Sequence, residues 1–237
     1  MGSQRTVIVV TGGDLVDASV LTQLPPAVAV VAADSGVDRA AELGLPVDVA
    51  VGDFDSVSTD ALRALADSGA VIEQHPEAKD ATDLEIGLDA ARRFSPTHIV
   101  VVGGHGGRLD HFVANALLLT SQRYADLAIT AKVGPATLTV VHSASAIHGQ
   151  PGELVSLLPI AGPAQGVHTE GLVYPLAGED LSPGSTRGVS NELVASTASV
   201  RLQTGVLLIV QPGFMGTHYL GATPSPVQTP DQRIIDA

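Results

Sequence analysis

Short aliphatic runs alternate with helix-like stretches along the chain up to about residue 133. Four of these runs predict strands, at residues 6–10, 28–32, 47–51 and 98–102. Most of them are apolar at consecutive positions, as expected of parallel strands that are buried on both faces. The alternation of such strands with helices predicts an α/β domain with a mostly parallel sheet covered by helices.

Two of the helices carry clear end signals. The stretch Ser58–Ser68 begins among Ser, Thr and Asp and is followed by Gly69, a residue that commonly ends helices. The stretch Thr82–Arg93 opens with the sequence TDLE, which has the pattern of a capping box. Its two final arginines lie near the negative end of the helix dipole.

After about Pro135 the pattern changes to β-rich runs separated by Gly, Pro, Ser and Asn. No helical period longer than two turns remains. We therefore expect an α/β domain at residues 1–135, an all-β sandwich domain at residues 136–216 and a Pro-rich C-terminal tail at residues 217–237.

Composition and charge exclude several classes of function. Of the 237 residues, 12 are Lys or Arg and 25 are Asp or Glu, which gives a net charge of −13. This balance argues against a protein that binds nucleic acid or an anionic membrane surface, because both need a basic face. There are no cysteines, so disulfides and thiolate zinc sites are excluded. The first residues resemble neither a signal peptide nor a membrane span, and we expect a cytoplasmic protein.

The segment VAVGDFDSV places two carboxylates, Asp53 and Asp55, just after a predicted strand. At the carboxyl end of a parallel strand, such a pair can share one Mg²⁺ ion and the phosphates that the ion holds. The alternative is a turn in which the aspartates hydrogen-bond to the backbone.

The segment KDATD brings a cation and another carboxylate to the start of a helix. Thr82 is the expected N-cap, so Asp83 lies in the first turn, where exposed N–H groups favour phosphate and its metal ion. Lys79, one of two lysines in the chain, can bind a phosphate oxygen. Alternatively, Asp83 merely complements the helix dipole.

A glycine-rich turn follows the last of the four predicted strands and opens another helix, in the sequence GGHGGRLDH. Such turns let phosphate approach the backbone. No Gly-Lys-Ser/Thr follows, so this is not a Walker loop. Arg108 is placed to contact phosphate with two N–H groups, and Asp110 and His111 lie in the first helical turn.

These motifs, in this order and spacing, resemble the catalytic domain of thiamine pyrophosphokinases: AADSG at 32–36, GDFDS at 52–56, KDATD at 79–83 and GGRLDH at 106–111. The second half resembles the thiamine-binding domain of the same family, in VSLLP at 155–159, TEGLVYPL at 169–176 and the pair Ser190–Asn191.

The resemblance implies transfer of a diphosphate group from ATP to the hydroxyl of thiamine, with Mg²⁺, giving thiamine diphosphate and AMP. It implies a metal site at Asp53, Asp55 and Asp83, with Arg108 and Asp110 also catalytic. The implied nucleotide-binding residues are Asp34, Lys79, Asp80, Thr82, Gly106, Gly107, Arg108 and His111. The implied thiamine-binding residues are Tyr174, Ser190 and Asn191.

The chain departs from the family pattern at two points. Ser35 stands where the family often has glycine, so this sequence argues against the close backbone approach that a glycine would allow there. The chain has no tryptophan, so stacking on thiamine falls to Tyr174, Phe214 or Tyr219.

Three other functions compete with this interpretation. A phosphohydrolase with an aspartate nucleophile would need a further acidic pair and would leave GGRLDH unexplained. A pyrophosphokinase for another alcohol, such as a pterin, would leave the second-half motifs unexplained. A non-catalytic nucleotide-binding sensor would not need the full set of carboxylates.

We further expect a homodimer with a composite active site, which pairs the α/β domain of one copy with the β domain of the other. The resemblance implies it, and a small β domain on a short connection near Gly134–Pro135 cannot easily fold over its own cleft. The apolar run GVLLIV at residues 205–210 is a candidate contact surface, or else an ordinary core strand.

Overall fold

The computed structural model describes residues 4–13, 18–76, 80–106 and 108–213. The first half alternates strands and helices as predicted. Its elements are β1 (Thr6–Thr11), η1 (Ala18–Gln23), β2 (Ala29–Ala33), α1 (Gly36–Glu42), β3 (Val49–Gly52), α2 (Thr59–Asp67), β4 (Val71–Gln74), α3 (Asp83–Arg92), β5 (His98–Val102), α4 (Leu109–Leu119), η2 (Gln122–Tyr124) and β6 (Ala128–Val133).

All four predicted strands of this half are confirmed, and so are the two capped helices. Ser58 Oγ accepts a hydrogen bond from the backbone N–H of Ala61 at the start of α2, and Thr82 Oγ1 accepts one from Glu85 at the start of α3. The edge strand β4 was not predicted, because its four residues alternate little and are largely exposed.

The second half contains strands, most of them short and antiparallel. They are β7 (Ala136–Val141), β8 (Ala144–His148), β9 (Leu154–Leu158), β10 (Ala164–Glu170), β11 (Ala177–Leu181), β12 (Asn191–Glu192), β13 (Thr197–Arg201) and β14 (Leu207–Gln211). The prediction of a β-rich second half is confirmed.

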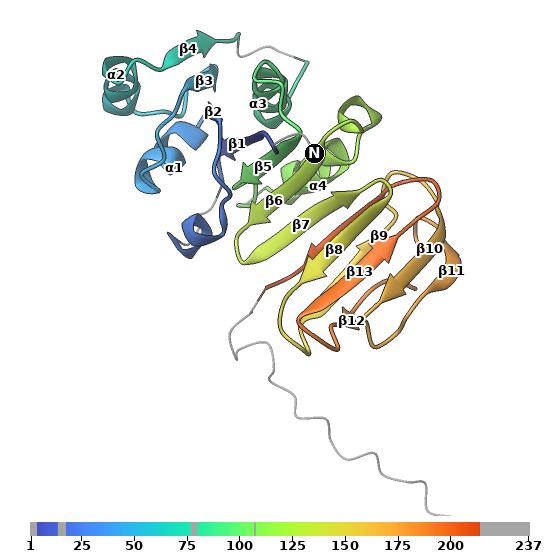
Figure 1. The fold of residues 1–237 in the computed structure, drawn as a ribbon. Coiled ribbons are helices and arrows are strands. Elements are labelled where there is room, and N and C mark those ends of the chain that lie inside the picture. The colour runs from blue at the N-terminus through green and yellow to red at the C-terminus, as the bar shows by residue number, and fades with distance from the viewer. Residues whose placement is uncertain (1–3, 14–17, 77–79, 107, 214–237) are drawn as a thin grey trace, which may run out of the picture.

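The two halves share one sheet. Its ten strands lie in the order β12-β9-β14-β7-β6-β5-β1-β2-β3-β4. Across the sheet, the six strands β4, β3, β2, β1, β5 and β6 pair in parallel. The next strands, β7, β14 and β9, pair antiparallel. The change occurs at the hairpin between β6 and β7, around Gly134–Pro135. Pro135 therefore lies in a tight turn within a continuous sheet (Figure 1). The division of the chain into domains at this residue stays a prediction.

Different layers cover the two faces of this sheet. Leu84 and Leu88 of α3 pack with Tyr124 of η2 on one face. Val20 of η1 and Ala40 of α1 pack on the other face of the parallel part. Figure 1 shows these helices grouped around the parallel strands, with the β-sandwich beside them.

The sandwich forms where a second sheet, β11-β10-β13-β8, packs on the antiparallel end of the large sheet. Its core joins Ile147 and Val200 of the small sheet to Leu157 and Ile209 of the large one. In the described part of the chain, no helix is both long enough and apolar enough to cross a bilayer.

The apolar run at residues 205–210 is not a contact surface. Val206, Leu207, Leu208 and Ile209 are each at most 3% exposed. Val206 precedes β14, and the other three form most of that strand, which lies between β7 and β9 inside the large sheet. The run is a core strand, and any contact between copies must use another face.

Candidate active site

A pocket of about 230 Å³ lies at the carboxyl ends of β1, β2 and β5. Because β2 and β5 lie on opposite sides of β1, the strand order reverses here, and open α/β sheets bind ligands at such a point. The pocket is lined by Thr11, Gly12, Gly13, Ala33, Asp34, Ser35, Asp83, Gly104, His105, Gly106, Arg108, His111 and Asn115. Five residues predicted for the site are among them: Asp34, Asp83, Gly106, Arg108 and His111.

Glycines let the loops around the pocket approach one another. Gly13 has φ +129°, and a β-carbon there would lie 2.2 Å from the backbone oxygen of His105. A β-carbon at Gly12 would lie 2.0 Å from Ser35 Oγ. Ser35 thus places a hydroxyl against the turn after β1.

Three carboxylates meet beside this pocket. Asp34 follows β2, and Asp53 and Asp55 follow β3; one oxygen from each lies within 4.8 Å of the others. β2 and β3 are parallel neighbours, so their carboxyl ends adjoin. Asp83 lines the pocket with Asp34 but does not belong to this group of three. Its role as a metal ligand stays a prediction.

Asp34 is held in an unusual conformation. Its φ is 48°, in the left-handed region that few residues other than glycine adopt. Its backbone N–H donates to the carbonyl of Val51 at 2.8 Å, and Ser56 Oγ donates to its Oδ2 at 2.8 Å. Its Oδ1 is buried and accepts no hydrogen bond from any residue that the structure describes.

Asp34, Asp53 and Asp55 therefore fit a divalent cation on two grounds. Mg²⁺ prefers carboxylate oxygens, and three are close enough to share one ion. Buried polar atoms nearly always have a partner, and a cation would supply one for Asp34 Oδ1.

Arg108 is the N-cap residue of α4, and its side chain contacts Asp110. Nε and Nη2 donate to the two oxygens of Asp110 at 3.0 and 2.6 Å. These hydrogen bonds hold the pKa of the Asp110 carboxyl well below its ordinary value. Both side chains are 65% exposed, so the pair contributes little to stability.

The segment before α3 is described in part. Lys79 lies outside the described residues, as does Gly107. Asp80 is exposed. The hydroxyl of Thr82 accepts from the backbone N–H of Glu85 at 3.3 Å, so it acts as a helix cap in this structure.

The three residues predicted to bind thiamine lie together. Tyr174 is 56% exposed. The Asn191 side chain is buried and holds the Tyr174 backbone: Oδ1 accepts from its N–H at 3.0 Å and Nδ2 donates to its carbonyl at 2.7 Å. Ser190 is exposed, has φ 56°, and donates its backbone N–H to Ser156 Oγ at 3.1 Å. Of the aromatic candidates, Phe214 and Tyr219 lie outside the described residues.

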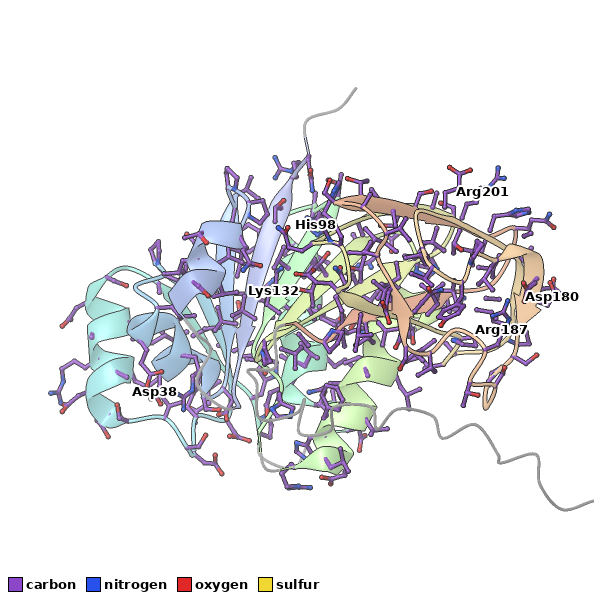
Figure 2. The ribbon with its side chains drawn as sticks, turned by 90° about the horizontal axis from the view of Figure 1, so that it is seen from below. Asp38, His98, Lys132, Asp180, Arg187 and Arg201 are labelled. Carbon is purple, nitrogen blue, oxygen red and sulfur yellow. The ribbon has the colours of Figure 1, made fainter. Side chains whose placement is uncertain are left out.

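This group is far from the carboxylates within one chain. β12, which begins at Asn191, and β3, which precedes Asp53, are separated by eight inter-strand steps. At about 4.8 Å per step, that is roughly 40 Å along the sheet. Figure 2 labels Asp38 of α1 in the parallel part of the molecule and Arg187, three positions before Ser190 in the sequence, toward the opposite end.

Sequence reasoning missed several residues of the pocket. Thr11, Gly12 and Gly13 follow the first strand, where the pair Gly12–Gly13 was the available signal. Asn115 lies one helical turn after His111 on α4, so their i, i+4 spacing places both on the pocket side.

Two family models match the chain. One, described as thiamin pyrophosphokinase, catalytic domain, matches residues 23–131. The other, described as thiamin pyrophosphokinase, vitamin B1 binding domain, matches residues 142–207. The two matches follow one another along the chain and together span most of it.

Individual proteins agree with these models. The thiamine pyrophosphokinase of Bacillus subtilis (strain 168) is 28% identical over 189 residues, covering 75% of this chain and 84% of that protein. A crystal structure of thiamine pyrophosphokinase from Bacillus subtilis superposes with a TM-score of 0.78 at 26% identity, covering 89% of this chain and all of that one. A crystal structure of thiamin pyrophosphokinase from Geobacillus thermodenitrificans superposes with a TM-score of 0.75 at 28% identity. The match covers 89% of this chain and 99% of that one. The chain belongs to the thiamine pyrophosphokinase family.

Proposed function

We propose that the chain carries out the reaction of its family: it transfers a diphosphate group from ATP to the hydroxyl of thiamine and releases AMP. The observation that carries the proposal is the pocket at the strand-order reversal. It brings together Asp34, Asp83 and Arg108 beside the carboxylates of Asp53 and Asp55. Matches to a catalytic and a vitamin B1 binding model, in that order, support the same reaction.

We also propose that the reaction depends on Mg²⁺. Asp34, Asp53 and Asp55 would hold the ion, and Asp83 stays the candidate for a further ligand from across the pocket. When bound, Mg²⁺ neutralises charge on the phosphate oxygens.

The pocket residues would bind and orient the nucleotide. The thiamine hydroxyl must attack the β-phosphorus, so the bond between the α- and β-phosphates has to lie in line with it. Arg108 can exchange Asp110 for a phosphate oxygen pair, because both are exposed. Holding the groups in line and matching their charge would supply most of the rate acceleration. A general base is optional in this reaction, and the site carboxylates are the candidates to accept the hydroxyl proton.

We propose that two copies build each active site. Within one chain the predicted thiamine residues and the carboxylates are too far apart to contact one substrate, at roughly 40 Å along the sheet.

An exposed apolar stripe on α4 suits a contact with a second copy. It consists of Leu109, Val113 and Leu117, which are 74%, 49% and 47% exposed and follow an i, i+4, i+8 spacing. Leu109 adjoins Arg108, so a second copy on this stripe would lie beside the pocket.

The test is an assay with ATP, Mg²⁺ and thiamine that follows AMP and thiamine diphosphate. We expect both products in equal amounts and neither when thiamine is omitted. Orthophosphate released without thiamine would instead indicate a phosphohydrolase. Transfer to a hydroxymethyl pterin, with none to thiamine, would indicate a pyrophosphokinase of different specificity. Nucleotide binding without any product would indicate a sensor.

A further inference from the structure

Ser56 donates a hydrogen bond to Asp34, one of the three grouped carboxylates, and has no role of its own in the proposed reaction. It follows Asp53 and Asp55 in the loop after β3, and its hydroxyl donates to Asp34 Oδ2 at 2.8 Å, across to the loop after β2. Asp34 and Ser56 are 22 positions apart, so this hydrogen bond ties together the two loops that contribute the three carboxylates.

The hydrogen bond from Ser56 determines which oxygen of Asp34 is left to bind a cation. With Oδ2 engaged by Ser56, the other oxygen, Oδ1, is left buried and accepts no hydrogen bond within the described part of the chain. The backbone of Asp34 is also constrained. Its N–H bonds to Val51, and its Cα would lie 3.0 Å from a β-carbon at Gly52.

Carboxylates that share a small site repel one another, so each tends to rotate away unless another contact holds it. Asp34 comes from a different strand than Asp53 and Asp55, and no short loop links it to them. A donor that holds Asp34 next to the other two therefore has a direct effect on the geometry of the group.

We propose that Ser56 is a positioning residue for divalent cation binding: its hydroxyl orients the Asp34 carboxylate so that Asp34, Asp53 and Asp55 can share one ion. The inference rests on the proposed metal site. Residues that hydrogen-bond to metal ligands typically change metal affinity about 10-fold to 100-fold when they are removed.

The experiment measures cation binding directly, with Mn²⁺ as a paramagnetic probe. The full-length protein is titrated with Mn²⁺ alone, and free Mn²⁺ is followed by electron paramagnetic resonance. We expect Ser56→Ala to raise the Mn²⁺ dissociation constant about tenfold or more, and Ser56→Thr, which keeps the hydroxyl, to restore it to nearly the wild-type value.

A matched control lies two residues further along the same loop. Ser58 caps α2 through its hydroxyl, which accepts from Ala61 at 3.1 Å. Ser58→Ala should lower thermal stability and leave the Mn²⁺ dissociation constant unchanged. Equal weakening by Ser58→Ala and Ser56→Ala would mean that any loosening of the loop reduces binding, and it would overturn the inference.

A double mutant tests whether Ser56 acts through Asp34. Adding Ser56→Ala to Asp34→Ala should weaken Mn²⁺ binding no further than Asp34→Ala alone, because the side chain that Ser56 orients is already gone. Additive weakening would mean that Ser56 contacts the ion or another ligand, and it would contradict the proposed role.

The titration does not depend on turnover, so the two proposals can fail separately. Wild-type protein that forms thiamine diphosphate, with Ser56→Ala binding Mn²⁺ as tightly as wild type, refutes the positioning role alone. Wild-type protein that binds Mn²⁺ in a Ser56-dependent manner but forms no product refutes the proposed reaction alone. Wild-type protein that binds no Mn²⁺ refutes the metal site and the positioning role together.

Discussion

Two residues other than glycine have left-handed backbones close to the carboxylates, Asp34 with φ 48° and Phe54 with φ 60°. Such conformations cost of order 1–3 kcal/mol each and persist where the surrounding structure holds them. Phe54 is buried in a cluster with Val37 and Val57, and Asp34 is tied to Val51 and Ser56. Strain of this kind concentrates at functional sites, which agrees with the location of the proposed metal site.

Asp55 offers a direct test of the metal site at the scale of one residue. Asp55→Asn removes one negative charge from the group and leaves an amide, which is a poor Mg²⁺ ligand. We expect turnover at saturating Mg²⁺ to fall about 100-fold or more, because the ion supplies several kcal/mol of stabilisation. The side chain is exposed, so thermal stability should stay close to wild type. Wild-type turnover would refute the assignment of Asp55.

Arg108 tests whether phosphate binding needs a two-pronged contact. Its guanidinium already donates two parallel hydrogen bonds to Asp110, the geometry that a phosphate group would take over. Arg108→Lys keeps the charge but not the fork, so kcat/KM for ATP should fall about tenfold, with KM for thiamine little changed. Steady-state kinetics with each substrate varied would measure this, and unchanged kinetics would make Arg108 a surface residue.

At the scale of elements, α3 connects the core to the pocket. Leu84 and Leu88 are buried against the sheet, and Asp83, at its first position, lines the pocket. The cap formed by Thr82 therefore determines where Asp83 lies. Because the Thr82 hydroxyl bonds to the backbone of Glu85, its predicted part in nucleotide binding and its part as a cap can be separated by experiment.

Thr82→Ala should lower the free energy of unfolding by about 1 kcal/mol, because one backbone N–H loses its acceptor. Chemical denaturation would measure the change, with Ser58→Ala at the start of α2 as a second cap of the same kind. If Thr82 also contacts the nucleotide, KM for ATP rises in Thr82→Ala and not in Ser58→Ala. A rise in KM for ATP without loss of stability would make nucleotide binding the main role of Thr82.

At the scale of the whole molecule, one sheet runs through both halves and separates the two groups of predicted site residues. The carboxylates follow β2 and β3 near one edge, and Ser190–Asn191 lie at β12, the other edge. A rigid sheet of this kind cannot fold back on itself, so a second copy is needed if both groups act on one pair of substrates.

A complementation experiment tests this arrangement. Asp55→Ala disables the metal side, and Ser190→Lys places a positive charge at an exposed residue that is predicted to face cationic thiamine. Co-refolding equal amounts of the two inactive variants should restore about a quarter of wild-type activity, because half the dimers are mixed and each has one intact site. A mixture that stays inactive, although mass spectrometry shows mixed dimers, would contradict shared sites.

Local patterns in the sequence were sufficient for much of the fold. Four parallel strands were predicted because buried parallel strands are apolar at most consecutive positions. The helices α2 and α3 were predicted because Ser58 and Thr82 are caps whose hydrogen bonds span three residues. Asp53 and Asp55 could be predicted as site candidates for the same reason: the strand end and the carboxylates are adjacent in the sequence.

What required the tertiary structure were the relations between distant segments. That Asp34 joins Asp53 and Asp55 follows from the pairing of β2 with β3, and no local pattern encodes which strands become neighbours. Asn191 matches a family motif, but its amide is engaged by the backbone of Tyr174, 17 positions away. From its sequence alone, the apolar run at residues 205–210 could be either a core strand or a contact surface. Packing between β7 and β9 decided that it is core, because burial depends on what the rest of the chain places around a segment.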